Sequence, residues 1–149
     1  MWNDAHDAYL ENRVLSAGPV ELVALLYQAC TARVREARIH LEAGRIAERS
    51  RAINRAHEIL NELATSLDFD RGGEISTRLA HLYDYMQRRL LDANLEQADA
   101  PLAEVLGLLA TLSEAWDGVG RQLAPAPPVE SAWAHSVPVE AVQAHAWSF

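Results

Sequence analysis

One apolar stripe near the end of the chain constrains the fold more than any other feature of the sequence. Between positions 102 and 123, large apolar side chains recur at spacings that alternate between three and four residues. They are Leu102, Val105, Leu109, Leu112, Trp116, Val119 and Leu123. This alternation places all of them on one side of an α-helix and is typical of a coiled-coil-like seam. Such a helix must bury its stripe against neighbouring helices.

Two further helices are predicted in the first half of the chain. Pro19 suits the first position of a helix because its φ angle is fixed, and Gly44 is a typical helix end. Between them, apolar residues recur at helical spacing. A second helix follows at once, and its apolar seam repeats every seven residues before the helix stops near Asp68. The seam consists of Ile46, Ile53, Leu60 and Leu67, with Ala56 and Leu63 beside it.

A third helix is predicted after the break made by Asp70 and the paired glycines Gly72-Gly73. Glu74 is expected to open it, because an acidic group is favourable at a helix N-terminus. The helix should end near Asn94, before Pro101 starts the fourth one. Its predicted apolar face consists of Ile75, Leu79, Leu82, Met86 and Leu90.

Short links between the predicted helices make successive helices antiparallel. The sequence therefore predicts an all-α fold, an antiparallel up-down four-helix bundle, over residues 19–123. A short N-terminal arm, residues 1–18, precedes the bundle. A Pro-started C-terminal tail, residues 124–149, follows it as a Pro-rich linker and an aromatic segment.

The aromatic segment of the tail contains no Lys or Arg but includes Trp133, Trp147 and Phe149. Disordered tails are normally poor in aromatic residues, so we favour a tail that docks, with free disorder and binding to a partner as alternatives. Val139, Val142 and Trp147 can share one side of a short helix. We therefore expect that such a helix could pack on an apolar surface of the chain itself.

Composition excludes several classes of function. The net charge is −8 and no basic run is longer than Arg88-Arg89, which argues against binding nucleic acid. No stretch approaches the roughly 20 apolar residues of a membrane span, so no membrane insertion is expected. The acidic N-terminus lacks the apolar core of a signal peptide, which predicts a cytoplasmic protein. One cysteine, Cys30, excludes an internal disulfide and is expected to be buried.

The chemistry of common bundle enzymes is also missing from the sequence. Di-iron bundles use Glu-x-x-His pairs, and no Glu in this chain is followed by His three positions later. The histidines are scattered, and no phosphate-binding or nucleophile motif is present. We therefore predict no enzyme activity, no catalytic residues, no cofactor and no metal site.

An ordered set of motifs resembles the flagellin export chaperone family, the FliS type, from Tyr9 to Trp116. The motifs are Ser16-Ala17-Gly18-Pro19, Leu25-Leu26-Tyr27, Leu67-Asp68-Phe69, Gly72-Gly73-Glu74-Ile75, Leu82-Tyr83-Asp84-Tyr85-Met86 and Glu114-Ala115-Trp116. Gly18 departs from the family's serine-like helix cap, a change that costs only a few tenths of a kcal/mol. The tail lies beyond the resemblance.

The resemblance implies a four-helix-bundle chaperone of bacterial flagellum biogenesis and type III protein export. Such proteins bind the disordered C-terminal segment of flagellin in the cytoplasm and prevent its premature polymerisation. They deliver it to the flagellar type III export apparatus, with the export gate and a flagellar regulator as further partners. The alternative function is a regulatory helical binding module that acts on another flagellar protein. We expect a monomer or a weak homodimer.

By the same resemblance, Tyr9 and Leu10 are candidates for a cap that occupies the flagellin cleft and is displaced by the substrate. The alternative is that they pack permanently on the first helix.

Three tyrosines combine an apolar ring with a polar tip and therefore suit the wet edge of a groove, namely Tyr27, Tyr83 and Tyr85. Tyr83 and Tyr85 are two residues apart and cannot face the same way on a helix, so one should enter the core and the other should border the surface. Asn54 and Asn61 lie seven apart on the second helix. Their amides could hold the backbone of a bound peptide, or simply flank the core.

Overall fold

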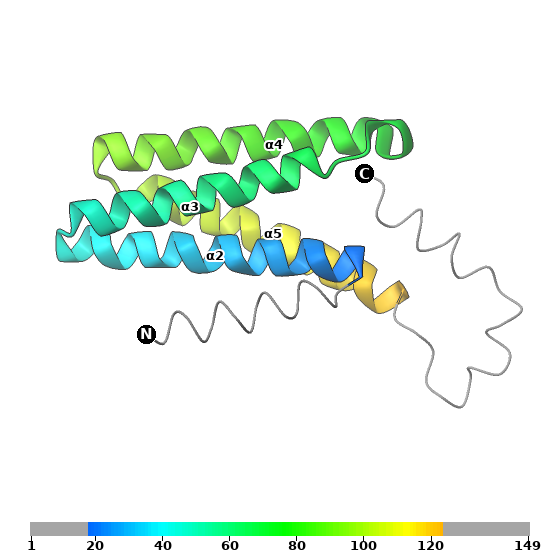
Figure 1. Ribbon diagram of the computed structural model, residues 1–149, viewed down its shortest axis with the longest axis horizontal. Coiled ribbons are helices and arrows are strands. Elements are labelled where there is room, and N and C mark those ends of the chain that lie inside the picture. Colours follow the sequence, from blue (N-terminus) through cyan, green and yellow to red (C-terminus); the bar gives the residue numbers. More distant parts are fainter. Residues whose placement is uncertain (1–17, 124–149) are drawn as a thin grey trace, which may run out of the picture.

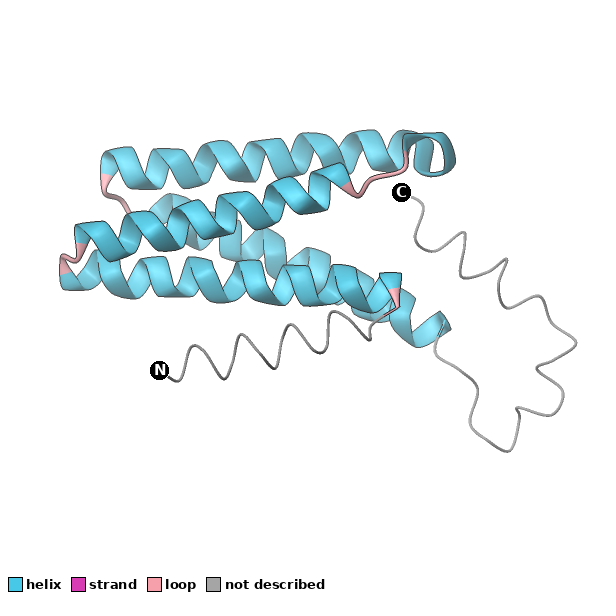
Figure 2. Cartoon of the chain, viewed as in Figure 1, coloured by secondary structure: helices cyan, strands magenta, loops and turns pink. Residues whose placement is uncertain are grey.

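The computed structural model describes residues 18–123, and side chains as far as Val119. Within these residues it contains four helices and no strand (Figures 1 and 2). They are α2 (Pro19–Ala43), α3 (Ile46–Thr65), α4 (Phe69–Glu96) and α5 (Ala100–Leu123). The predicted all-α four-helix bundle is confirmed. The arm before Gly18 and the tail at 124–149 lie outside the described residues, so the domain boundaries remain predictions.

The helices form a closed ring around one core. α2 contacts α3 and α5, and α4 contacts the same two helices. Figure 1 shows that each helix runs opposite to the one before it, with the turns at alternate ends of the bundle. This is the up-down topology that short connections favour. It brings the start of α2 and the end of α5 to the same end of the molecule.

The stripe on α5 is the best-predicted part of the core. Leu102, Val105 and Leu109 are fully buried, and Trp116 is almost so. Leu112 and Val119 are partly buried against the same cluster. The facing seam of α3 is buried at Ile53, Ala56, Leu60 and Leu63.

The turn between α2 and α3 is as tight as Gly44 predicts. Gly44 adopts a left-handed conformation with φ of 73°, which costs glycine little because it has no Cβ. The Arg45 N–H then donates to the carbonyl of His40 at 2.9 Å, which satisfies one of the free carbonyls at the end of α2. The chain thereby reverses direction directly into α3.

The start of α4 differs from the prediction that Glu74 opens this helix. Asp68 caps a helical turn that begins at Phe69, and its Oδ1 accepts from the N–H groups of Asp70 and Arg71 at 3.1 Å. The predicted break is present one turn later, because Gly73 has φ of 51° and ψ of −122°. Helical geometry resumes only after this kink.

Two residues expected in the core are instead exposed. Ile75 is 54% exposed, and Ser76 takes the buried place beside it and donates to the Asp68 carbonyl at 2.9 Å. The buried face of α4 runs through Ser76, Tyr83 and Met86, and Ile75 lies one residue to the side of it. Ile46, at the start of α3, is 59% exposed. Apolar spacing alone does not show which of two adjacent positions faces the core.

Replacing Gly73 by alanine should lower the free energy of unfolding by about 1–2 kcal/mol, because a side chain in the left-handed region is strained. Chemical denaturation measures this change. Gly107→Ala is the control. It lies within α5 with open space around its Cβ position, so it should raise stability by about 1 kcal/mol. Equal effects at the two positions would contradict the kink.

Candidate functional site

Three aromatic side chains meet inside the bundle, in the half nearer the start of α2. They come from three helices, Tyr27 from α2, Tyr83 from α4 and Trp116 from α5. The hydroxyl oxygens of the tyrosines lie 2.5 Å apart, and the Trp116 Nε1–H donates to the Tyr27 oxygen at 3.0 Å. The Tyr27 ring lies 6.4 Å from each of the other two, centroid to centroid. We call these three residues the aromatic triad.

Burial of the triad corrects one expectation for the tyrosines. Tyr27 and Tyr83 are 0% and 1% exposed, so their placement at a wet groove edge is wrong. Tyr85 is half-buried and its hydroxyl donates to Glu104 Oε2 at 2.7 Å. The expected division is therefore confirmed, with Tyr83 in the core and Tyr85 at the surface. The sequence offered no sign that two tyrosines 56 positions apart share a hydrogen bond.

Burial also keeps the tyrosine hydroxyls and the Cys30 thiol in their neutral, protonated forms. It raises the pKa of Tyr27 and, more strongly, that of Tyr83, so both remain neutral hydroxyls. Cys30 lies on the neighbouring turn of α2 with its Sγ 3.6 Å from the carbonyl of Ala56. Burial raises the pKa of its thiol to about 12. A thiol in this state is not a nucleophile at neutral pH.

A hollow of about 230 Å³ opens beside the triad. Its walls come from all four helices and consist of Pro19, Leu22, Val23, Leu63, Ser66, Leu67, Tyr83 and Trp116. None of these side chains carries a charge. We call this feature the aromatic hollow. It is the described surface best suited to an apolar side chain from another segment.

Asn54 and Asn61 are placed on the outside of the bundle. Both are exposed on α3, and no hydrogen bond joins either amide to another described residue. Neither lines the aromatic hollow. The structure thus leaves both amides available to a bound backbone but does not bring them together with the tyrosines. The other two candidates, Tyr9 and Leu10, lie outside the described residues.

A polar network joins α4 to α5 around Tyr85. The Arg89 Nε donates to Glu104 Oε1 at 2.6 Å, and another nitrogen of Arg89 contacts Asp92 at 3.1 Å. Hydrogen bonds from Tyr85 and Arg89 hold the pKa of Glu104 below its ordinary value. The hydrogen bond from the Tyr85 hydroxyl to Glu104 raises the pKa of Tyr85. This network is on the surface and sets the pairing of the two helices.

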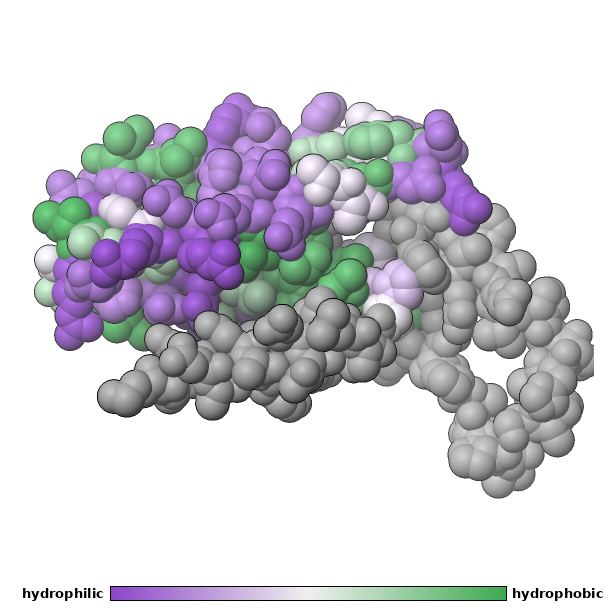
Figure 3. All heavy atoms as spheres, viewed as in Figure 1, coloured by the Kyte–Doolittle hydropathy of each residue, from purple (hydrophilic) through white to green (hydrophobic). Residues whose placement is uncertain are grey.

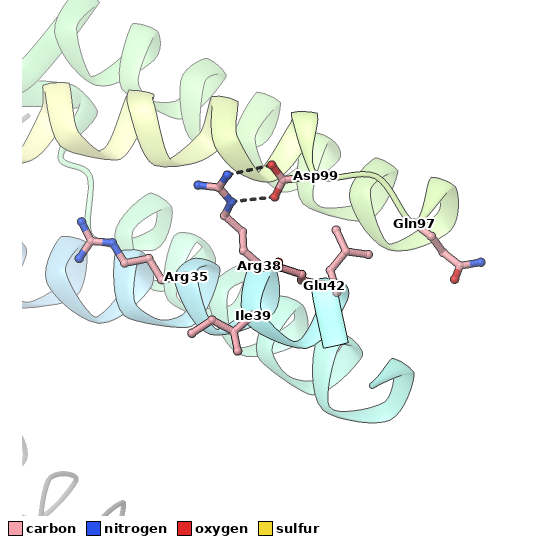
Figure 4. A pocket seen from close by; sticks show the side chains of 7 residues that line it. Arg35, Arg38, Ile39, Glu42, Gln97 and Asp99 are labelled. Carbon is pink, nitrogen blue, oxygen red and sulfur yellow. Dashed lines mark hydrogen bonds and ion pairs between the residues drawn. The ribbon is translucent and has the colours of Figure 1, made fainter. Parts of the chain in front are cut away.

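The opposite end of the bundle has a second, wider hollow of about 720 Å³ (Figure 4). There the Arg38 guanidinium donates two hydrogen bonds to the Asp99 carboxylate. Its Nε lies 2.7 Å from Oδ1, and its Nη2 lies 2.8 Å from Oδ2. Figure 4 shows that this pair of hydrogen bonds connects α2 to the turn before α5. The hydrogen bonds from Arg38 lower the pKa of Asp99. Charged and apolar groups line the hollow together, so it is a poorer site for an apolar partner.

Three exposed apolar side chains also lie near this end. Ile39, Leu91 and Leu95 are all exposed, Leu95 to 82%. Figure 3 shows hydrophobic spheres scattered among hydrophilic ones where the α2–α3 and α4–α5 turns lie. Scattered residues of this kind are common on protein surfaces.

Neither a metal site nor a membrane span is found in the described part of the chain. Residues 18–119 contain no group of three or more His, Cys, Asp or Glu side chains that could hold a metal ion. No described helix is long and apolar enough to cross a bilayer. What the structure offers is a rigid helical bundle with an apolar hollow and exposed polar groups, which is suited to binding another polypeptide.

Comparison with known proteins gives the family of this bundle. The family described as "Flagellar protein FliS" matches residues 1–123. The flagellar secretion chaperone FliS of Salmonella typhimurium is 42% identical over 108 residues, which cover 72% of this chain and 80% of that protein. The flagellar secretion chaperone FliSB of Pseudomonas aeruginosa is 37% identical over 110 residues, 74% of this chain and 87% of that protein. The FliS of Bacillus subtilis is 34% identical over 111 residues, 74% and 82% of the two chains.

The chain belongs to the FliS family of flagellar secretion chaperones. This confirms the resemblance found in the sequence motifs, and the family is one of chaperones rather than enzymes. The match ends where α5 ends, so residues 124–149 lie beyond it.

Replacing Tyr27 by phenylalanine removes the hydroxyl that both Trp116 and Tyr83 contact. Because the site is buried, we expect the free energy of unfolding to fall by roughly 1–3 kcal/mol with little change in helix content. Chemical denaturation monitored by circular dichroism measures this. Tyr85→Phe is the matched control and should cost much less, because its hydroxyl is at the surface. Equal losses would contradict a buried network.

Replacing Asp99 by asparagine should slightly lower stability at neutral pH, because it weakens the pair of hydrogen bonds from Arg38. The folded pKa of Asp99 lies below its ordinary value of 3.8. Its stabilising contribution is therefore present above that value and is lost as the pH falls through the folded pKa. The difference in unfolding free energy between wild type and variant should shrink below about pH 4. Glu96→Gln, at an exposed carboxylate with no described ion pair, should show no such trend.

Proposed function

We propose that this chain is a flagellin export chaperone. It binds the disordered C-terminal segment of flagellin in the cytoplasm, prevents premature polymerisation and delivers flagellin to the flagellar type III export apparatus. The observation that carries this proposal is the match to the FliS family over residues 1–123. Relatives named flagellar secretion chaperones, up to 42% identical over most of their length, support it.

The geometry supports a binding role of this kind. A disordered segment loses conformational entropy when it binds, so it must bury substantial apolar surface in return. The aromatic hollow offers a place for one large apolar side chain of that segment at the junction of four helices. The closed core keeps the hollow in shape without the partner, which reduces the cost of binding.

Under this proposal the candidate residues have different roles. Tyr27 and Tyr83 act from inside, by holding the wall of the aromatic hollow in place. Asn54 and Asn61 donate to or accept from the backbone of the bound segment. Tyr9 and Leu10 belong to the arm that leads into Pro19, and they form a cap over part of the flagellin cleft that flagellin displaces.

The second proposed contact is with the export gate or a flagellar regulator. The candidate surface for this contact is the opposite end of the bundle, where Ile39, Leu91 and Leu95 are exposed. That surface lies away from the aromatic hollow, so a bundle that holds flagellin there would still be able to contact another protein. A regulatory module without flagellin binding is the alternative function.

Titration calorimetry with the C-terminal segment of the host's flagellin tests the function. We expect one segment to bind per chain at micromolar concentration or below, with an increase in helix content by circular dichroism. The N-terminal segment of the same flagellin is the control. No binding of the C-terminal segment at micromolar concentrations would overturn the proposal.

The double variant Asn54→Ala and Asn61→Ala tests the role of the amides. Each lost hydrogen bond is worth about 0.5–1.5 kcal/mol, so the affinity should fall by roughly 5- to 150-fold while stability stays unchanged. Gln28→Ala removes an exposed amide from α2 and should leave the affinity unchanged. An equal effect of both changes would show that the two asparagines have no specific role.

A further inference from the structure

The aromatic hollow is too small for most small-molecule ligands. Its volume of about 230 Å³ is below the roughly 300–1,000 Å³ of typical ligand pockets. It fits one large side chain together with a short piece of backbone. Its lining carries no charge, so it favours an occupant that brings none.

The aromatic triad contains one more hydrogen-bond donor than the hydrogen bonds that join its members use. Trp116 contributes one N–H, and each of the two tyrosines contributes one O–H. Only two hydrogen bonds join the three groups, so one tyrosine hydrogen has no acceptor among residues 18–119. A buried donor without an acceptor is unfavourable. When Tyr27 donates within the pair, the spare hydrogen belongs to Tyr83, a residue of the hollow's wall, and an occupant with a carbonyl group beside it would supply the acceptor.

The C-terminal tail begins close to this site. α5 ends at Leu123, and Trp116 lies two helical turns earlier, a distance of about 10 Å. The Pro-rich stretch 124–128 spans about 15 Å when extended, enough to return to the hollow. The first large aromatic residue after this stretch is Trp133. Between Leu123 and Trp133 the only charged residue is Glu130, and the whole tail contains no Lys or Arg.

We propose that the C-terminal tail folds back over this end of the bundle and that Trp133 occupies the aromatic hollow. A carbonyl of the tail accepts the spare hydroxyl hydrogen of the tyrosine pair. Trp133 is favoured over Trp147 because the shorter loop loses less entropy when it closes. The tether gives the tail a local concentration near the millimolar range, so even weak contacts keep it docked.

Docking of the tail does not itself depend on flagellin. Because the proposed function places flagellin in the same hollow, the tail competes with flagellin and must leave before flagellin enters; this consequence rests on the proposed function. The tail, which lies beyond the family match, would then be a second occupant of the aromatic hollow.

Nuclear magnetic resonance of the full chain with isotope-labelled tryptophan tests the docking. The chain has four tryptophans, Trp2, Trp116, Trp133 and Trp147, and hence four indole N–H signals. We expect Trp133→Ser to shift the Trp116 signal, because the new residue empties the hollow beside it. In the wild type, the Trp133 indole hydrogen should exchange with solvent at least several-fold more slowly than that of Trp147.

Three controls make the outcome decisive. Trp147→Ser, in the same tail, should leave the Trp116 signal in place. If Tyr9→Ser with Leu10→Ser shifts the Trp116 signal and Trp133→Ser does not, the arm occupies the hollow and the proposal is wrong. Tenfold dilution of the wild type should change nothing, and a shift on dilution would show that the tail of a second copy fills the hollow instead.

Titration of the same variants with the flagellin segment separates this proposal from the proposed function. Trp133→Ser should bind the segment several-fold more tightly than the wild type because the two occupants compete, and an unchanged affinity would overturn the competition. Loss of flagellin binding in every variant would overturn the proposed function but leave the indole signals as the test of tail docking. An unshifted Trp116 signal would overturn tail docking even if flagellin binds.

Discussion

The hydrogen bond between Tyr27 and Tyr83 is the constraint on which the rest of the bundle depends. α2 and α4 lie across the ring from each other, so this bond passes through the centre of the core. Apolar side chains alone tolerate small rotations and shifts of a helix. A buried polar pair does not, because any shift leaves a donor or an acceptor unsatisfied. Trp116 extends the same constraint to α5.

The sequence predicts most of the fold because the fold is built from local signals. The stripe of α5 and the seam of α3 identify the buried faces, and Gly44 identifies a helix end by its conformational freedom. The prediction fails at the start of α4. Asp68 starts this helix a turn early, and Ser76 rather than Ile75 continues its buried face, although Ile75 continues the apolar spacing.

The candidate site is less predictable because it depends on pairs that are distant along the chain. Spacing separates Tyr83 from Tyr85 correctly, since two residues apart on a helix cannot face the same way. Spacing says nothing of the partner of Tyr27, because the contact joins helices whose relative rotation is set by the whole core. Asn54 and Asn61 share a face of α3, as their interval of seven predicts, but only the structure shows that this face points away from the aromatic hollow.

The burial of Cys30 means that the reactivity of this thiol can measure how often the bundle opens. It is the chain's single cysteine, and in the closed bundle its thiol is both covered and protonated. A thiol reagent can therefore reach it only when α2 separates from α3, as a local or global fluctuation. The rate of labelling then measures how often the core opens, without any introduced probe. A partner that stabilises the contact between α2 and α3 would slow the labelling reaction. A partner that separates the two helices would speed it.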